Sequence, residues 1–255
     1  MAYPRDFFGT YLLKPGNDTY AAVSSALRVG YRAFDTAPLY RNESDVGRAI
    51  RDSALSREEI FIQTKIWDTD QGYEGTHNSV RQSMQRLGVK HINSVLIHSP
   101  RPGKAIVQDS WRAMTELKAE GHIGEIGVSN FGAAQIGWLQ SVPAINQIDI
   151  SPFNQRRELR TYCQDNGILL QVHSSLTRGY KLKDDLLQKL ASRYKHVTPA
   201  MILLAWCRRT CDSVVVKSRD PAHMVENLSG LTQEEMSELE SLETGYRVMG
   251  WDVSV

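Results

Sequence analysis

Residues 31–48 read YRAFDTAPLYRNESDVGR and contain a short apolar run, a polar turn and the start of a helical pattern. The apolar run at 32–34 predicts a strand. Asn42 and Glu43 are typical of a helix N-terminus, where we expect Asn42 to act as the cap. The turn between strand and helix carries a carboxylate, Asp35, and a phenol, Tyr40. This stretch therefore predicts a strand-to-helix junction with reactive side chains in its turn.

The same alternation continues through the rest of the chain. Helical patterns occupy residues 18–29, 44–53, 78–87, 105–119, 133–141, 157–166, 183–194, 199–210 and 222–230. Short apolar runs predict strands at 7–13, 32–34, 60–64, 92–97, 124–128, 144–147, 168–172 and 213–216. Strands that alternate with helices of about 10–15 residues indicate βαβ units and a parallel sheet.

A parallel sheet of this kind can be open or closed. An open doubly wound sheet needs a glycine-rich phosphate turn after its first strand, but the turn here, LLKPGNDT, has one glycine and a proline. Eight predicted strands in 255 residues, with no evident linker, favour a closed (β/α)8 barrel, or TIM barrel, that forms one domain over residues 1–255.

The charges of the chain are balanced and scattered. Because the formal net charge is only +1, we expect a small-molecule partner and no nucleic acid. The sequence has no cationic leader and no run of about 18 apolar residues, so we expect a cytoplasmic protein without a membrane segment. Cys163, Cys207 and Cys211 form neither a disulfide framework nor a metal knuckle, and we expect reduced thiols. A monomer is the default expectation.

Polar residues follow the predicted strands at the points where the strands end. The carboxyl ends of the strands meet at one face of a (β/α)8 barrel, where active sites are built. We therefore expect these side chains to converge on one pocket. They are Asp35, Lys65, His98, Ser129, Asn130, Gln147, His173 and Lys217.

Two kinds of chemistry fit this set poorly. A metal hydrolase could use Asp35, His98 and His173 as ligands. The ammonium of Lys65 would repel the ion, however, and no two histidines have ligand spacing, so we expect no metal. A Schiff-base mechanism would need an unprotonated Lys65, which the neighbouring carboxylate of Asp35 opposes.

Protonation of a carbonyl oxygen fits the set better. Asp35 would hold Lys65 as a cation, Lys65 would lower the pKa of Tyr40, and Tyr40 would act as the general acid. His98 would orient the carbonyl or share the proton. Reduction also requires a hydride, which no side chain can supply, so a nicotinamide cofactor is implied.

The remaining strand ends suit a dinucleotide. Ser129, Asn130 and Gln147 offer donors and acceptors for a carboxamide, and His173 offers a flat ring for stacking. Cations that precede a helix make an anion site for a nucleotide phosphate. The stretch 214–227, VVVKSRDPAHMVEN, supplies such a site with Lys217, Ser218 and Arg219.

Six motifs in this order resemble the aldo-keto reductase family across almost the whole chain. They are DTAPLYRNE (35–43), FIQTKIW (61–67), LIHSP (96–100), GEIGVSNF (124–131), NQIDISPFNQ (146–155) and VVVKS (214–218). The stretch KIWDTDQGYEGT at 65–76 is most similar to the branch of microbial diketogluconate reductases and protozoan prostaglandin F synthases. The resemblance implies a (β/α)8 barrel that binds NADPH across its carboxyl-terminal face and reduces aldehydes and ketones to alcohols.

The matching positions imply a role for each residue. Tyr40 is implied as the proton donor, Asp35 and Lys65 as the pair that lowers its pKa, and His98 as the residue that orients the carbonyl. Trp67, with His98 and Tyr40, is expected to line the substrate pocket. The implied cofactor contacts are Gly9, Thr10, Tyr11, Asp35, Ser129, Asn130, Gln147, His173, Ser174, Leu176, Lys217, Ser218, Arg219, His223, Glu226 and Asn227. Of these, Lys217 and Ser218 would meet the 2′-phosphate, and Glu226 and Asn227 the adenine.

Four features depart from the family pattern. His173 stands where an aromatic residue usually stacks on the nicotinamide, which would weaken binding or make it pH-dependent. His223 replaces an arginine, which leaves Arg219 as the second phosphate partner and makes use of NADH possible. Ser99 replaces a tryptophan after His98, which would open that wall of the pocket. Both termini are short, with little room for a strand pair at the barrel base, so we expect an open, permissive pocket.

An alternative from another class is a nicotinamide-binding redox sensor with little or no turnover. The intact set of Asp35, Tyr40, Lys65 and His98 favours the enzyme over the sensor. Near the C-terminus, residues 233–243 predict an amphipathic helix. The apolar tail at 245–255 is expected to fold over the pocket mouth.

Overall fold

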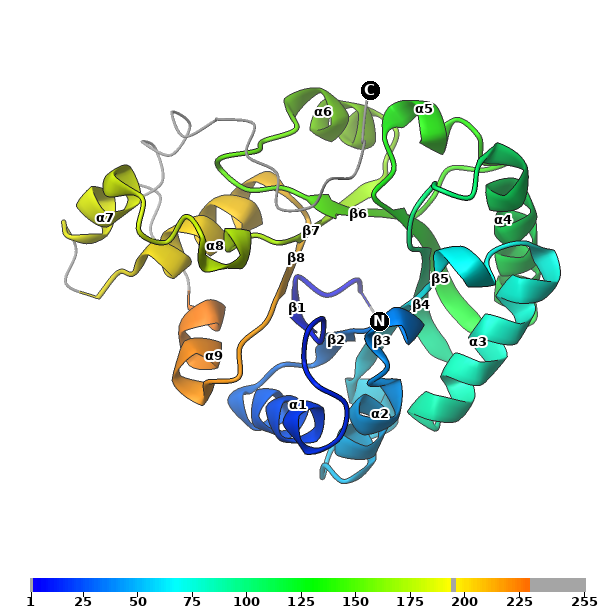
Figure 1. Ribbon diagram of the computed structural model, residues 1–255, viewed down its shortest axis with the longest axis horizontal. Coiled ribbons are helices and arrows are strands. Elements are labelled where there is room, and N and C mark those ends of the chain that lie inside the picture. The colour runs from blue at the N-terminus through cyan, green and yellow to red at the C-terminus, as the bar shows by residue number, and fades with distance from the viewer. Residues whose placement is uncertain (1, 194–195, 230–255) are drawn as a thin grey trace.

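The computed structural model describes residues 2–193 and 196–229. Within these residues, eight parallel strands close into a barrel in the order of the sequence, and the helices form an outer ring around them (Figure 1). The predicted (β/α)8 architecture is confirmed. The expectations for residues 233–243 and 245–255 lie outside the described part of the chain.

The strands lie close to their predicted positions, with ends that differ by a few residues. Their bounds are β1 (Asp6–Gly9), β2 (Ala33–Asp35), β3 (Phe61–Ile66), β4 (Ile92–Ile97), β5 (Ile123–Ser129), β6 (Ile145–Asp149), β7 (Leu169–His173) and β8 (Ser213–Val216). The first strand is shorter than expected, because the chain turns at Tyr11 and Leu12 and the backbone of Leu12 is left-handed. This early turn brings the β1–α1 connection onto the carboxyl-terminal face of the barrel.

Nine α-helices connect the strands or follow them within the described residues. They are α1 (Asn17–Val29), α2 (Glu43–Arg51), α3 (Tyr73–Leu87), α4 (Lys104–Ala119), α5 (Ala133–Ile136), α6 (Arg157–Asp165), α7 (Asp185–Ala191), α8 (Pro199–Thr210) and α9 (Pro221–Leu228). The predicted helix at 133–141 stops at Ile136, where Gly137 disfavours its continuation and turns follow. None of the helices in the described ranges is both long and apolar enough to cross a membrane.

The side chains of the strands alternate between two environments. In β2, Phe34 packs in the large apolar core under the helices, whereas Ala33 and Asp35 face the barrel interior. The interior is apolar near the amino-terminal end, where Phe7 and Phe61 pack together. It becomes polar toward the carboxyl-terminal end, and this change places the reactive groups on a rigid base.

The segment before β1 contributes to the base of the barrel. The ring of Tyr3 lies 5.5 Å from that of Phe7 and 5.2 Å from that of Phe61, and its hydroxyl donates to the side chain of Gln63 (2.6 Å). The short N-terminus therefore still supplies an aromatic residue to the base, although we expected little room there.

Asn42 occupies the expected N-cap position of α2, but its side chain does not cap the helix. Its amide instead donates to the backbone oxygens of Thr10 (2.9 Å) and Leu13 (3.3 Å) and accepts from the hydroxyl of Thr36 (3.0 Å). The expectation of a side-chain cap is wrong because these closer partners compete for the same groups. Asn42 thus fastens the β1–α1 connection to the turn that holds the site.

Candidate active site

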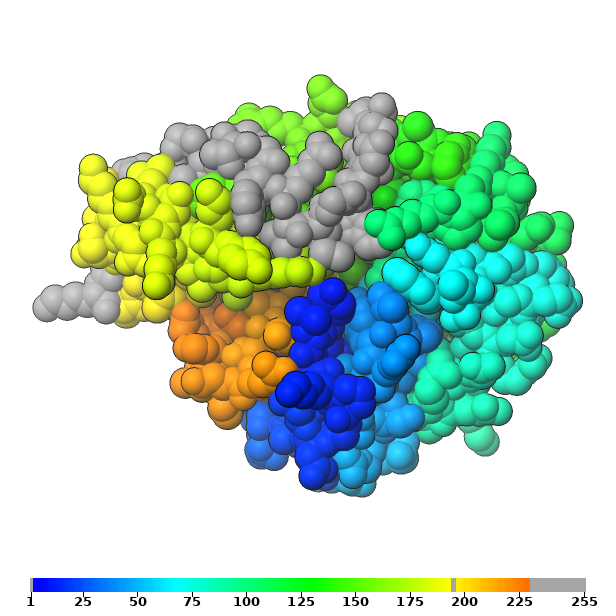
Figure 2. Space-filling model, in the orientation of Figure 1, coloured from blue at the N-terminus to red at the C-terminus, as the bar shows by residue number. Residues whose placement is uncertain are grey.

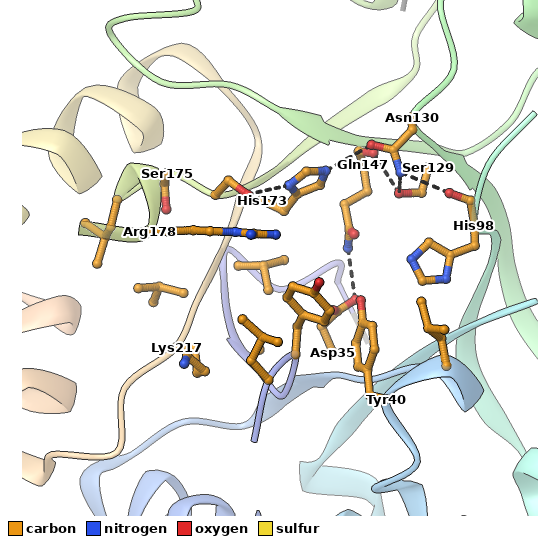
Figure 3. A pocket seen from close by; sticks show the side chains of 18 of the residues that line it. Asp35, Tyr40, His98, Ser129, Asn130, Gln147, His173, Ser175, Arg178 and Lys217 are labelled. Carbon is orange, nitrogen blue, oxygen red and sulfur yellow. Dashed lines mark hydrogen bonds between the residues drawn. The ribbon is translucent and has the colours of Figure 1, made fainter. Parts of the chain in front are cut away.

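A cavity of about 710 Å3 opens at the carboxyl-terminal ends of the strands (Figure 3). The structure brings most of the expected site residues into its wall, from segments that lie far apart in the sequence. These are Gly9, Tyr11, Asp35, Tyr40, Trp67, His98, Ser129, Asn130, Gln147, His173, Ser174, Leu176 and Lys217. Of the eight strand-end residues expected to converge on one pocket, seven line this cavity, and Lys65 lies outside its wall.

Asp35 and Lys65 form a buried ion pair beneath the pocket floor. The ammonium of Lys65 donates to both carboxylate oxygens of Asp35 at 2.7 Å, and to the backbone oxygen of Thr36 at 3.2 Å. The side chain of Lys65 is 0% exposed and that of Asp35 is 4% exposed. Burial lowers the pKa of Lys65, while the charge of Asp35 opposes this shift. Removal of either partner would leave an uncompensated buried charge.

Tyr40 lies at the end of a short 3-10 helix, η1 (Pro38–Tyr40), and its side chain lines the pocket (Figure 3). Its hydroxyl is 3.3 Å from the ammonium of Lys65. The expected net lowering of the Tyr40 pKa is not found, because the pKa is raised well above its usual range. Burial is the main cause, and the charge of Asp35 adds to it. Both effects favour the protonated form of the phenol.

His98 stands between two aromatic rings in the pocket wall. Its ring lies 5.9 Å from that of Tyr40 and 5.0 Å from that of Trp67, and it meets both edge to face. Burial, together with the charge of Lys65, lowers the pKa of His98 well below its usual range, so the imidazole is neutral. Its Nδ1 atom is buried and has no hydrogen-bond partner among the described residues. The arrangement places a neutral imidazole beside a protonated phenol.

His173 is held in place by hydrogen bonds at both of its ring nitrogens. The side chain of Asn130 donates to the backbone oxygen of His98 and to Ser129 Oγ, each at 3.0 Å, so its Oδ1 atom must accept. Nε2 of His173, 3.1 Å away, therefore carries the hydrogen, and Nδ1 accepts from Ser174 (2.9 Å). Burial lowers the pKa of His173 to about 3. The expected pH dependence therefore does not arise from this imidazole near neutral pH.

Gln147 faces the pocket but directs its amide nitrogen into the barrel (Figure 3). The nitrogen donates to Asp35 Oδ1 (2.9 Å) and to Gln171 Oε1 (2.7 Å). Ser129 donates its hydroxyl hydrogen to the backbone oxygen of Gln147 (3.0 Å). The set expected to hold a carboxamide is thus already cross-linked by its own hydrogen bonds.

The opposite end of the pocket is cationic. Lys217 is half-buried there, and its pKa is lowered by burial and by the charges of Arg219 and Arg178. Arg219 is bound to the carboxylate of Asp18 (3.0 to 3.2 Å) and to the backbone oxygen of Leu12 (3.0 Å), so it links the β8–α9 segment to α1. These two segments lie side by side on the surface in Figure 2.

Several expected contacts lie behind or beside the pocket wall. Glu226 accepts a hydrogen bond from Thr198, His223 is exposed, and Asn227 is buried. Ser99 is fully buried, donates to Asp68 (2.6 Å) and is not among the residues that line the pocket. The expected site residues outside the wall are Thr10, Lys65, Ser218, Arg219, His223, Glu226 and Asn227.

The pocket also contains residues that the sequence did not single out. Arg178 and Tyr180 follow β7, and the guanidinium of Arg178 lies 5.4 Å from the ring centre of Tyr11. Arg101 follows β4, while Leu12 and Leu39 line the mouth. The only sequence signal for Arg178 is its position beside Gly179 after a strand, where turns are common.

Neither metal ligation nor reactive thiols are indicated in the described residues. No group of three or more His, Cys, Asp or Glu side chains among them could hold an ion. The cysteines are free and buried, and burial raises the pKa of Cys163 to about 11 and that of Cys211 to about 12. The expectation of reduced thiols is consistent with this burial.

The (β/α)8 barrel thus carries a phenol, an imidazole and a buried lysine–aspartate pair at its carboxyl-terminal end, and comparison with known proteins places it in the oxidoreductase class. Residues 7–244 match the model of the "Aldo/keto reductase family". The chain is 35% identical to a glyoxal reductase of Bacillus subtilis over 94% of this chain and 89% of that protein. It is 34% identical to a 9,11-endoperoxide prostaglandin H2 reductase of Trypanosoma cruzi over 97% and 90%.

A solved structure supports the same assignment. The aldo-keto reductase MGS-M4, from a Medee basin deep-sea metagenome library, superposes with a TM-score of 0.90 at 34% identity, covering 99% of this chain and 96% of that one. The chain belongs to the aldo-keto reductase family. This family reduces carbonyl compounds and uses nicotinamide cofactors, generally NADPH.

Proposed function

We propose that the chain reduces aldehydes and ketones to alcohols with NADPH, and that Tyr40 is the proton donor. The observation that carries this proposal is the protonated phenol of Tyr40, 3.3 Å from the ammonium of Lys65 and beside a neutral His98. Family membership supports the carbonyl chemistry.

The raised pKa of Tyr40 suits a general acid. The phenol holds its proton until a carbonyl oxygen beside it gains negative charge, and it then transfers the proton to that oxygen. The phenolate that forms lies next to Lys65, which Asp35 fixes in place. Stabilisation by this preorganised cation appears only as the proton leaves, so it favours the transition state over the ground state.

His98 would act as a neutral partner in the same step. A neutral imidazole has one N–H donor, which can bind the carbonyl oxygen and aim it at the hydroxyl of Tyr40. Trp67 packs against His98 and forms the adjoining wall, where the rest of the substrate would lie. Hydrogen bonds would therefore hold the substrate at its carbonyl oxygen, and the rest of the substrate would make fewer directional contacts.

A bound nicotinamide would supply the hydride. Ser129, Asn130 and Gln147 would hold its carboxamide, and Lys217 with Ser218 would hold the 2′-phosphate. The structure fits such a group, because Lys217 is half-buried among like charges that depress its pKa, and a phosphate would relieve that repulsion. Arg219 is held close to the same place by Asp18, so the 2′-phosphate meets a cationic surface that favours NADPH over NADH.

The remaining cofactor contacts and the organisation of the chain are part of the same proposal. Glu226 and Asn227 would meet the adenine, and His173 would border the nicotinamide. Residues 1–255 would act as one domain and as a monomer in the cytoplasm. The match of the family model to residues 7–244 supports the single domain.

The test is oxidation of NADPH, and of NADH in parallel, with a panel of small aldehydes, ketones and glyoxals. Glyoxals belong in the panel because the Bacillus subtilis relative is a glyoxal reductase. We expect turnover with several members and a higher kcat/KM with NADPH. Tight binding of NADPH without turnover on any member would contradict the proposal and favour a sensor, although no feature of the described residues points to one.

A further inference from the structure

A chain of buried amides runs from the base of the barrel to the pocket. It links Tyr3, Gln63, Gln171 and Gln147, and it ends on the carboxylate of Asp35. Gln63 and Gln171 are 0% exposed and Gln147 is 2% exposed. A buried polar network destabilises the fold unless every polar group in it has a hydrogen-bond partner. A network of this extent therefore suggests a functional role.

The orientation of each amide in this chain is fixed by its neighbour. The hydroxyl of Tyr3 donates to Gln63 Oε1 (2.6 Å), and burial raises the pKa of Tyr3, so it remains a donor. The nitrogen of Gln63 then faces Asp35 Oδ1 (2.8 Å) and Gln171 Oε1 (2.6 Å). Gln171 completes the pattern by donating to Ser213 (3.3 Å).

Gln147 receives its orientation from the same neighbours. Its amide nitrogen has two hydrogens, and both are used, one by Asp35 and one by Gln171. A flipped amide would set its oxygen against the Asp35 carboxylate and the Gln171 oxygen, and both contacts would be repulsive. Only the oxygen of Gln147 is therefore left for a ligand in the pocket.

We propose that Gln63 and Gln171 are positioning residues, which hold the Gln147 side chain so that it offers the pocket an acceptor and not a donor. This inference rests on the proposed function, because the group that Gln147 would accept from is the N–H of a nicotinamide carboxamide. Gln171 acts directly through its oxygen, while Gln63 fixes Gln171 and also binds Asp35. This chain of buried amides thus links the orientation of the cofactor to the carboxylate that anchors Lys65.

The test uses a coenzyme that lacks the amide hydrogens. NADP+ and 3-acetylpyridine adenine dinucleotide phosphate differ in that an acetyl group replaces the carboxamide, which keeps the carbonyl and removes the N–H donor. Their dissociation constants are measured by tryptophan fluorescence for the wild type, Gln171→Met and Gln171→Glu. 2′,5′-ADP reports on the phosphate end alone, and Gln85→Met on the exposed surface of α3 is the matched control.

The wild type is expected to prefer NADP+ by about two- to tenfold, which corresponds to one hydrogen bond. Gln171→Met should reduce this preference, because Gln147 then loses one of the two acceptors that fix its amide and is held by Asp35 alone. Gln171→Glu, whose oxygens still accept from both amides, should retain it. Affinity for 2′,5′-ADP should not change in any variant. The Gln85→Met variant should match the wild type throughout.

Equal affinity of the wild type for the two coenzymes would overturn the inference, and so would a preference in Gln171→Met as large as that of the wild type. If Gln171→Met does not fold, the wild-type comparison decides alone. Failure of the proposed function would look different. A protein that binds both coenzymes without turnover would contradict the function but not the inference, and a wild type that binds neither coenzyme would show that the site does not take a nicotinamide at all.

Discussion

Replacement of Lys65 by Met tests the buried ion pair on which the site is built. Methionine fills a similar volume but leaves the carboxylate of Asp35 without its cation, and neither side chain has contact with water beyond 4% exposure. Breaking a buried pair by removal of one partner costs about 3–5 kcal/mol. Because Gln63 and Gln147 still donate to the carboxylate, we expect the lower half of that range, about 3 kcal/mol.

The assay is urea unfolding at pH 8, where the variant should lose the full amount of stability. The control is Lys118→Met, which breaks an exposed pair with Glu125 whose side chains are 43% and 48% exposed. That change should cost about 0–1 kcal/mol. A Lys65→Met variant as stable at pH 8 as the control would refute the reasoning.

Three further results are expected. The pKa values of His98 and His173 are both far below the usual range, so kcat/KM should not change between about pH 5 and 8 through titration of a histidine in the pocket. A step near pH 6.5 in the pH–rate profile would contradict this. Lys217→Met should weaken NADPH binding about tenfold or more and NADH binding far less, as measured by fluorescence titration, because a charge-assisted contact to the 2′-phosphate is lost; equal effects would remove Lys217 from that role. Thr198→Ala removes the N-cap of α8 and the hydrogen bond to Glu226, and should lower the free energy of unfolding by about 0.5–2 kcal/mol in urea denaturation, whereas an unchanged midpoint would show that the cap contributes nothing.

The barrel was predictable because its signals are local. Each strand is a short apolar run that ends at a polar residue, and the parallel arrangement follows from the helices between the strands. Asp35, Lys65 and His98 could be placed together before any coordinates, since strand ends must meet at one face of a closed barrel. The structure confirms that convergence.

The electrostatic state of the site was not predictable in the same way. A lysine near a phenol suggests a lowered pKa, but the outcome depends on whether the lysine is neutralised and on how deeply the phenol is buried. The contacts of Lys65 with both oxygens of Asp35, and the desolvation of the half-buried Tyr40, depend on the three-dimensional structure. The sign of the shift therefore emerged only from the structure.

Partners that are distant in sequence explain the other differences. Asn42 has the right type for a cap, but the loop at Thr10 and Leu13 comes close enough to take its side chain. Gln63 and Gln171 lie within apolar strand runs, FIQT and LLQV, and a polar residue inside such a run is a signal that could have been used. The loop that presents Arg178 has no comparable pattern.

The measurement that tests the central claim most directly is turnover by Tyr40→Phe beside its binding of NADPH. The phenylalanine keeps the ring and removes only the hydroxyl, and Tyr73→Phe on α3, outside the pocket wall, is the matched control. Loss of a general acid should reduce kcat by about 10²–10⁴-fold, with the dissociation constant of NADPH unchanged and the control fully active. A Tyr40→Phe variant that turns over as fast as the control would contradict the assignment of Tyr40 as the proton donor.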